Sequence, residues 1–355
     1  MPDNPIHVLY NGNQDSSFRA WLNSRKVTLH QHEPHWKDKI EEMRQNGDTK
    51  VSHLFSHPGN YFGTWQRIDI PLFLDDEYVL LLDADTIIRK QFALADLGNE
   101  LTESIAMSSE INLGDKQPSN AGVTLMKLET LRKTHSDFMG FIMKHVKKGG
   151  KFNHPSPSDQ GAYMVFYKNS VTFLDEKFNV KPYWSFPIPD FQNSYILHFH
   201  GPKPNDYIRF IMDKKCGPAI DFLCERGLHS SPFILCQSLA VFARASLSVD
   251  KHAFCTLSFA NHTQASFCQS LMEQLSGSHE PQCGNFEALI QKSWEGANTD
   301  TSLLRLREVE DLMLHMEQEG FLRNARFLVF FILGSVSFFY TWKYCSRKSH
   351  KKRIR

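Results

Sequence analysis

Short apolar runs alternate with amphipathic stretches through roughly the first two thirds of the chain, which is the pattern of an α/β domain. The clearest run is Tyr-Val-Leu-Leu-Leu at 78–82, whose lack of alternation predicts a central strand covered on both faces. The other predicted strands are 6–10, 27–32, 104–108, 122–126, 171–174 and 195–199. Helices are predicted at 17–24, 60–74, 127–147 and 158–167.

The pattern changes after about residue 228, where helical spacing and cysteines replace the alternation of strands and helices. Apolar residues recur at 3,4,3 spacing within 303–319, which fits a short coiled-coil stalk or a helix packed on the domain. We therefore divide the chain into five parts. These are an α/β domain at 1–228, a helical cysteine-containing region at 229–295, a linker and amphipathic stalk at 296–324, a transmembrane helix at 325–344 and a basic tail at 345–355.

The composition is that of an ordinary folded protein, with 355 residues of which 41% are apolar and 22% charged. With 40 basic against 39 acidic side chains the net charge is +1, so the chain has no global field that would attract nucleic acid. A mean hydropathy of −0.39 excludes a protein with many membrane spans. Only local features can therefore identify its partners.

The carboxyl end combines an uncharged segment with a basic tail. Residues 327–342 contain no charged side chain, whereas 343–355 contain seven Lys or Arg and no acid. We predict a single membrane span whose tail stays cytosolic, which places the catalytic domain in the lumen of the endoplasmic reticulum or Golgi. The alternatives are a buried carboxyl-terminal helix and a tail-anchored protein with a cytosolic domain. Lumenal placement requires an amino-terminal signal, and residues 1–10 contain no apolar core for one.

Six of the seven cysteines lie between Cys216 and Cys283. An even, clustered set suits disulfides in an oxidising compartment; six buried thiols are the alternative. Asn261-His262-Thr263 is the chain's one glycosylation sequon, and it favours the same compartment. The spacing of the cysteines indicates neither a zinc site nor a particular pairing.

Asp83-Ala84-Asp85 follows directly on the predicted strand at 78–82. In an extended chain, side chains two residues apart project to the same side, so both carboxylates can converge at the carboxyl end of the strand. Open α/β sheets bind ligands in that crevice. Two anions this close repel unless a cation neutralises them, and carboxylate oxygens suit Mg²⁺ or Mn²⁺. The alternative, ordinary for so short a motif, is a loop that carries two acids.

Five short blocks occur in a fixed order along the chain. They are Gly63-Thr64-Trp65-Gln66-Arg67-Ile68-Asp69-Ile70-Pro71, Leu82-Asp83-Ala84-Asp85-Thr86, Asn120-Ala121-Gly122-Val123, Ser158-Asp159-Gln160-Gly161-Ala162 and Leu197-His198-Phe199-His200-Gly201-Pro202-Lys203-Pro204. In this order they make the chain resemble the family 8 glycosyltransferases, the group of glycogenin and bacterial lipopolysaccharide galactosyltransferases, over about residues 5–210. The resemblance implies a GT-A-like domain with a Rossmann-like mixed sheet. It also implies retaining transfer of a sugar from a nucleotide-sugar donor, which we expect to be a UDP-sugar.

The resemblance implies a metal site formed by Asp83, Asp85 and His198, with Mn²⁺ as the expected cofactor and Mg²⁺ as the alternative. An imidazole beside two carboxylates is also the chemistry that favours Mn²⁺ over Mg²⁺. The cation would stabilise the departing nucleoside diphosphate. We assign the metal role to His198 and expect His200 to be an ordinary packed or exposed histidine.

The remaining matches imply donor-binding and catalytic residues. The donor-binding set is Arg67, Asp83, Ala84, Asp85, Asn120, Ala121, Gly201 and Lys203. Within it, Lys203 and Gly201 match the residues that bind the diphosphate. Asp159 and Gln160 match the catalytic pair below the anomeric carbon, where a carboxylate can bind a sugar hydroxyl and an amide can face an oxocarbenium-like transition state.

The chain also departs from the family pattern. The stretch from His198 to Lys203 is one residue shorter than usual, and Gly161 replaces a frequent acid. The family opens with a strand and helix that form much of the nucleoside pocket, whereas the run at 6–10 resembles the family's second strand. We therefore expect one strand-helix unit to be missing, either because Met1 is not the natural start or because the unit has been lost.

Three functions fit these residues. The first is a membrane-bound, Mn²⁺-dependent retaining glycosyltransferase that acts on a glycan, glycoprotein or glycolipid acceptor. The second is a catalytically inactive, membrane-anchored relative that binds carbohydrate or a partner. The third is a cytosolic, glycogenin-like initiator. The donor sugar, the acceptor and the linkage depend on variable loops, so the sequence does not predict them.

Overall fold

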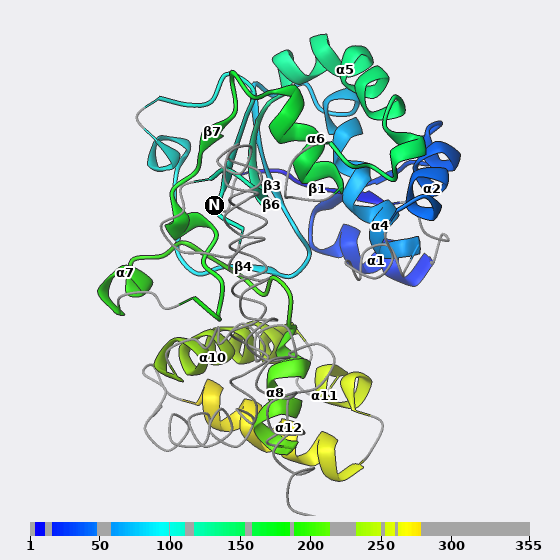
Figure 1. The fold of residues 1–355 in the computed structure, drawn as a ribbon. Helices are drawn as coiled ribbons and strands as arrows, with labels where there is room; N and C mark the ends of the chain where they lie inside the picture. The colour runs from blue at the N-terminus through cyan, green and yellow to red at the C-terminus, as the bar shows by residue number, and fades with distance from the viewer. Residues whose placement is uncertain are drawn as a thin grey trace, which may run out of the picture.

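The computed structural model describes ten stretches of the chain. They are residues 4–10, 16–47, 58–98, 100–110, 117–152, 158–184, 188–213, 232–249, 253–259 and 262–277. Within them, an α/β part built from about the first 200 residues lies against a smaller group of helices from the later residues (Figure 1). All seven predicted strands occur in the structure, most of them within one or two residues of the predicted ends.

The amino-terminal residues form a strand-helix-strand unit. Its elements are β1 (Ile6–Tyr10), α1 (Ser16–Ser24) and β2 (Val27–Gln31), followed by α2 (Lys37–Gln45), which the hydrophobic pattern did not predict. β1 and β2 pair in parallel, with Leu9 opposite His30. A parallel pair needs a crossover connection, and α1 forms part of it.

The main sheet is mixed and has four strands in the order β3-β6-β5-β7. The strands are β3 (Tyr78–Leu82), β5 (Ile105–Ser108), β6 (Asn120–Lys127) and β7 (Thr172–Phe173). β6 pairs antiparallel with β3 and β5, and β5 pairs in parallel with β7. This mixed α/β sheet fits the expected GT-A fold.

The prediction that β3 is the covered central strand is wrong for the described part of the chain. β3 lies at the end of the main sheet, and its five residues are half-buried. The longer β6 takes a central place because it pairs along both edges, and seven of its eight residues are buried. The apolar run at β3 is explained by partial burial of its two faces, since Val79 and Leu81 pack on the core of the helices while alternate residues pack on a second cluster.

A second pair of strands forms beside the main sheet and was only half predicted. β4 (Thr86–Ile88) pairs antiparallel with β8 (Ile196–His198), with Thr86 opposite His198. Since β4 begins one residue after Asp85, this pairing brings the acidic motif next to a histidine from a distant part of the chain.

Helices cover the sheet on one side, where Figure 1 shows α4, α5 and α6 together. These elements are α4 (Pro58–Trp65), the 3-10 helix η1 (Gln66–Leu72), α5 (Leu128–Met143) and α6 (Ser158–Phe166). Their core contains Trp65, Phe138 and Tyr163, all almost fully buried. Shorter segments complete this part: η2 (Leu94–Leu97), η3 (Val146–Lys148), η4 (Glu176–Phe178) and α7 (Ile188–Gln192).

The later helices share a hydrophobic core with the α/β part. They are α8 (Pro204–Asp213), α10 (Pro232–Val249), α11 (Ala253–Ser258) and α12 (His262–Ser276). Leu197 and Phe199, at the end of β8, belong to the same buried cluster as Leu239 of α10 and Leu271 of α12. The helical region thus packs directly behind the strand that carries His198.

A disulfide joins Cys255 of α11 to Cys268 of α12, and Cys236 of α10 is also disulfide-bonded. The predicted stalk at 296–324, transmembrane helix at 325–344 and basic tail at 345–355 lie outside the described residues. Among the helices that are described, none is long and apolar enough to cross a bilayer.

Candidate active site

Backbone hydrogen bonds hold the acidic motif between two strands. The amide of Asp83 donates to the carbonyl of Gly122 on β6 at 2.8 Å, and the amide of Phe199 donates to the carbonyl of Asp85 at 2.9 Å. Ala84 lies in the turn between the two acids, which a bond from the Thr86 amide to the Asp83 carbonyl closes at 3.1 Å. The carboxylates therefore leave the sheet at a defined point.

Asp83, Asp85 and His198 come together as the resemblance implied. Their ligand atoms all lie within 4.8 Å of one another, and Nε2 of His198 is 3.2 Å from Oδ1 of Asp85. His198 is buried, whereas the side chains of Asp83 and Asp85 are 35% and 24% exposed. The buried Oδ1 of Asp85 has no hydrogen-bond partner. Two carboxylates and an imidazole around an unsatisfied oxygen fit a divalent cation, although their role as metal ligands stays a prediction.

Gly122 makes room for the histidine ring. A Cβ at this position would lie 2.1 Å from Cε1 of His198 and 2.8 Å from its Nε2. Both distances are shorter than a van der Waals contact, so the ring and a Cβ cannot occupy these positions together. The glycine within the Asn120-Ala121-Gly122 block is therefore required by packing against His198. The sequence prediction included this block but gave Gly122 no role.

Arg67 on η1 is buried and bridges two acids. Its guanidinium lies 3.0 Å from Oδ1 of Asp83 and 3.2 Å from Oδ2 of Asp159, and it donates to the carbonyl of Ala121. Burial lowers the pKa of Arg67, but the charges of Asp83 and Asp159 outweigh burial and raise the pKa above its ordinary value. The arginine thus links the acidic motif to the predicted catalytic pair.

The predicted catalytic pair opens helix α6. Asp159 is almost fully buried, which raises the pKa of its carboxyl to about 6 even though Arg67 opposes the shift. Gln160 accepts a hydrogen bond through Oε1 from the amide of Ala121 at 2.9 Å. The preceding Ser158 has a φ of +59°, a conformation that is uncommon for a residue with a side chain and recurs at functional sites.

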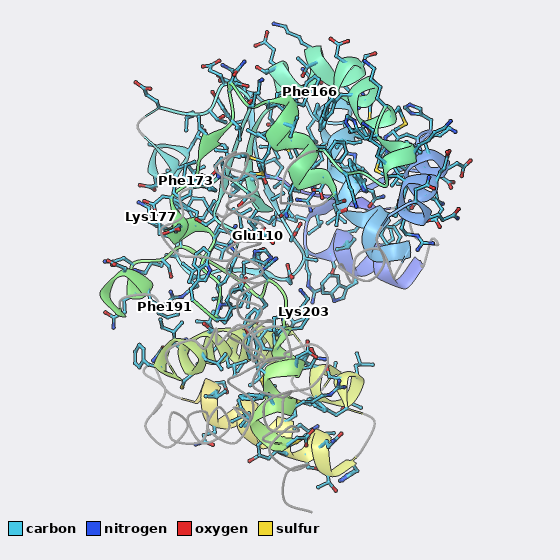
Figure 2. The ribbon with its side chains drawn as sticks, viewed as in Figure 1. Glu110, Phe166, Phe173, Lys177, Phe191 and Lys203 are labelled. Carbon is cyan, nitrogen blue, oxygen red and sulfur yellow. A yellow bond between two sulfur atoms is a disulfide. The ribbon has the colours of Figure 1, made fainter. Side chains whose placement is uncertain are left out.

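Lys203 and Gly201 follow β8. Nζ of Lys203 donates to Oδ2 of Asp85 and, at 3.0 Å, to the carbonyl of Phe199. The sequence predicted a phosphate contact for this lysine, and the structure places its charge directly beside the metal motif. Gly201 adopts a φ of +73°, the left-handed region that favours glycine. In Figure 2, Lys203 lies where the α/β part meets the helices.

The charges around Asp85 oppose the effect of its burial. Burial would raise the pKa of Asp85, but His198 and Lys203 together hold the pKa well below its ordinary value. Burial lowers the pKa of His198, although Asp85 acts in the opposite direction. These charges keep Asp85 ionised, which is the state that a carboxylate metal ligand needs.

Sequence reasoning missed a polar network beside this cluster. Asn120 donates through Nδ2 to Oε2 of Glu110 at 2.8 Å, and the other oxygen of Glu110 lies 3.0 Å from Nε2 of His200. His200, which we expected to be an ordinary packed or exposed histidine, packs beside the metal ligands: its ring lies 5.4 Å from that of His198, and its Nδ1 bonds to the hydroxyl of Tyr183 at 2.6 Å. Figure 2 shows Glu110 near the middle of the molecule.

Lys181 is a second buried residue near the site that no sequence motif indicated. Its side chain is fully buried, and Nζ donates to the carbonyl of Ser109 at 2.7 Å. Burial lowers the pKa of Lys181 to about 7, although Glu110 and Glu176 oppose the shift. His200 had one signal in the sequence, its position two residues after His198, whereas Glu110 and Lys181 had none.

Comparisons with known proteins agree with the motifs. The profile described as Glycosyl transferase family 8 matches residues 12–207. Similar solved structures include the glycosyltransferase GlyE of Streptococcus pneumoniae TIGR4, at 17% identity and a TM-score of 0.37, covering 57% of this chain and 50% of GlyE. An active-site mutant of LgtC gives 19% identity and a TM-score of 0.40, covering 57% of this chain and 80% of LgtC.

The matched region is thus about half the length of the GlyE structure. A search of curated proteins gave no match. Because the family profile covers more than half of the 355 residues, the chain belongs to glycosyl transferase family 8.

Proposed function

We propose that this protein is a retaining glycosyltransferase that moves a sugar from a UDP-sugar donor to a glycan, glycoprotein or glycolipid acceptor. The observation that carries the proposal is the group of Asp83, Asp85 and His198, which opens beside the buried pair of Arg67 and Asp159. A cation site next to a buried arginine and a carboxylate suits a diphosphate leaving group attached to a sugar.

The residues fit a divalent cation, with Mn²⁺ preferred over Mg²⁺. Asp83 and Asp85 would supply oxygen ligands and His198 a nitrogen ligand, and the unsatisfied Oδ1 of Asp85 would gain a partner. When bound, the cation would stabilise the negative charge of the departing nucleoside diphosphate.

Other side chains would bind and orient the donor. Lys203 carries a charge that can move from Asp85 to phosphate, because its ammonium lies on a flexible, half-exposed stem. Asn120 and Ala121 would contact the donor sugar. Asp159 and Gln160, both fixed by contacts to neighbouring residues, would face the anomeric centre.

We also propose that the protein is held in the endoplasmic reticulum or Golgi membrane by its carboxyl-terminal helix, with the active site in the lumen. The bonded cysteines Cys236, Cys255 and Cys268 support an oxidising compartment over the cytosolic, glycogenin-like alternative. Labelling of Asn261 by lumenal glycosylation would test this placement. An unglycosylated Asn261 with reduced cysteines would contradict it.

The activity is tested with the full chain, a panel of UDP-sugars and Mn²⁺, measuring release of UDP and transfer to glycan acceptors. Asp83→Asn and Asp85→Asn should lower turnover by about 100-fold or more, because metal coordination contributes several kcal/mol to catalysis. Asp75→Asn is the matched control, since this acid is fully exposed. Binding of a UDP-sugar without turnover would instead support a carbohydrate-binding module.

A further inference from the structure

Asn179, which lies outside the five motif blocks, contacts the metal site through the side of the His198 ring that faces away from Asp85. Its Oδ1 lies 2.8 Å from Nδ1 of His198, the ring nitrogen that faces away from Asp85. Its Nδ2 donates to Oδ1 of Asn120 at 2.8 Å. The side chains of Asn179, Asn120 and His198 are almost fully buried, so water cannot replace these bonds.

The direction of each hydrogen bond follows from Glu110. A carboxylate only accepts, so Asn120 must turn its Nδ2 toward Glu110. Oδ1 of Asn120 then accepts from Asn179 and from the amide of Gly122 at 3.2 Å. Asn179 consequently has only its carbonyl oxygen left for His198.

This direction determines the tautomer of His198. Facing a carbonyl oxygen, Nδ1 must carry the proton and donate it to Asn179, which leaves a lone pair on Nε2. Nε2 is the nitrogen that points at Asp85, 3.2 Å away. In the other tautomer, two lone pairs would face each other across 2.8 Å at Asn179, and the Nε2 proton would occupy the space of the cation. With Nδ1 protonated, the Nε2 lone pair and Oδ1 of Asp85 face each other across 3.2 Å, an arrangement that a cation between them stabilises.

We propose that Asn179 is a positioning residue of the metal site, which holds His198 in the Nδ1-protonated tautomer with Nε2 directed at the cation. The inference rests on the proposed function, because it assumes that the cluster binds a divalent metal. Partners of this kind orient metal-bound histidines, and their loss typically weakens metal affinity 10- to 100-fold. Asn179 also joins His198 to Asn120, so the metal ligand and a predicted donor-sugar residue share one rigid support.

The first test measures Mn²⁺ binding to the full chain, without donor, from the electron paramagnetic resonance signal of free Mn²⁺. Asn179→Leu removes the acceptor and should raise the dissociation constant about 10- to 100-fold. Asn179→Asp keeps an oxygen opposite Nδ1 but loses the donor to Asn120, so it should lose less Mn²⁺ affinity than Asn179→Leu. Ser194→Ala is the control, because Ser194 is equally buried and hydrogen-bonded but lies outside the site.

The second test reads the tautomer directly, in metal-free protein labelled with ¹⁵N-histidine. The His198 signals, assigned with His198→Gln, should show a protonated Nδ1 in wild type and in Asn179→Asp, and a shift toward protonated Nε2 in Asn179→Leu. An Nδ1 that carries no proton in wild type would overturn the inference. So would a folded Asn179→Leu that binds Mn²⁺ like wild type, or an Asn179→Asp as weak as Asn179→Leu.

The two tests separate this inference from the proposed function. If wild type binds no Mn²⁺, the metal-dependent function fails, while the nitrogen signals still decide whether Asn179 sets the tautomer. If Asn179→Leu does not fold, wild type and Asn179→Asp still give both readouts.

Discussion

Asp69 and Asp85 are both acids held beside histidines, but their oxygens differ in how completely they are bonded. Asp69, on η1, is fully buried; its Oδ2 accepts from Nε2 of His32 at 2.7 Å and from Nε1 of Trp36 at 2.8 Å. Its Oδ1 accepts from Nε2 of His135 at 2.8 Å. Asp85 is partly exposed, and its buried Oδ1 has no hydrogen-bond partner.

The difference separates a structural cluster from a site that can bind a ligand. Burial alone would raise the pKa of Asp69, but the bonds from His135, His32 and Trp36 outweigh it and lower the pKa. Every oxygen of Asp69 is thus satisfied by the protein, which leaves nothing for a ligand. At Asp85 one oxygen remains available, so the same residue types leave room for a cation.

The hydrogen bonds of Asp69 also support the candidate metal site. Asp69 ties η1 to the segment after β2, to the residue before α2, and to α5. Arg67, two positions earlier on η1, forms ion pairs with Asp83 and Asp159. Because Asp69 is hydrogen-bonded on both oxygens, it fixes η1, and η1 in turn positions Arg67 at the candidate site.

The largest expected effect comes from Asp69→Ala. The change leaves the donors of His32, Trp36 and His135 without an acceptor, and should destabilise the fold by about 3–5 kcal/mol. Asp85→Ala removes an oxygen without a hydrogen bond and an ion pair to a half-exposed lysine, so it should cost less than Asp69→Ala, about 1–2 kcal/mol. Urea denaturation of both variants measures the contrast. Equal losses would contradict the distinction between the two clusters.

The second-largest effect is a change of about 2–3 kcal/mol in the free energy of unfolding with pH. The pKa of Asp69 lies below its ordinary value, so its charge stabilises the fold above about pH 4 and this contribution is lost as the pH falls. Burial raises the pKa of Asp159 to about 6, so ionising Asp159 costs stability that grows from about pH 4 to 6. Asp159→Asn should therefore gain stability relative to wild type as the pH rises from 4 to 7. A difference that stays flat across urea denaturations at these pH values would refute the assignment.

Gly122→Ala should weaken cation binding at Asp83, Asp85 and His198, and it should destabilise the fold less than Asp69→Ala does. The added methyl group must displace the His198 ring, which should lower Mn²⁺ affinity at least about tenfold and stability by about 1–3 kcal/mol. Gly140→Ala is the matched control. Nothing lies within 4 Å of a Cβ at this position of α5, and alanine favours a helix. Calorimetric titration with Mn²⁺ compares the two variants.

The smallest expected effect is that of Lys203→Met. Its Nζ neutralises Asp85 but is 47% exposed, so stability should change by less than about 1 kcal/mol. Mn²⁺ should bind about two- to fivefold more tightly at low salt, and the gain should fade as salt rises. Weaker Mn²⁺ binding in this variant would show that the lysine supports the metal site rather than competing with it.

Local patterns predicted much of the framework. The strands at 78–82 and 6–10 have the predicted ends, because each is a short apolar run bounded by polar or turn residues. β4 was missed, because three residues with no run of their own depend on pairing with β8. α8 was missed because Pro204 begins it immediately after a loop of glycine and proline.

The sequence predicted which motif residues form the candidate site but not the hydrogen bonds that hold them in place. The motif order identified Asp83, Asp85, His198, Arg67 and Asp159, and the structure brings all five together. Asn179 and Glu110 had no motif, since a buried asparagine or glutamate is recognised only by what it contacts. The expected position of β3 failed for the same reason: strand order depends on long-range pairing.

The sequence by itself determined the family, the strand that ends at the acidic motif and the residue types able to hold a cation, because these depend on local pattern and the order of short blocks. Only the tertiary structure decided which acid has both oxygens hydrogen-bonded and which has one without a hydrogen bond, and which ring nitrogens of His198 face Asn179 and Asp85. Those outcomes depend on hydrogen bonds between residues far apart in the chain, whose distances and directions no local pattern contains.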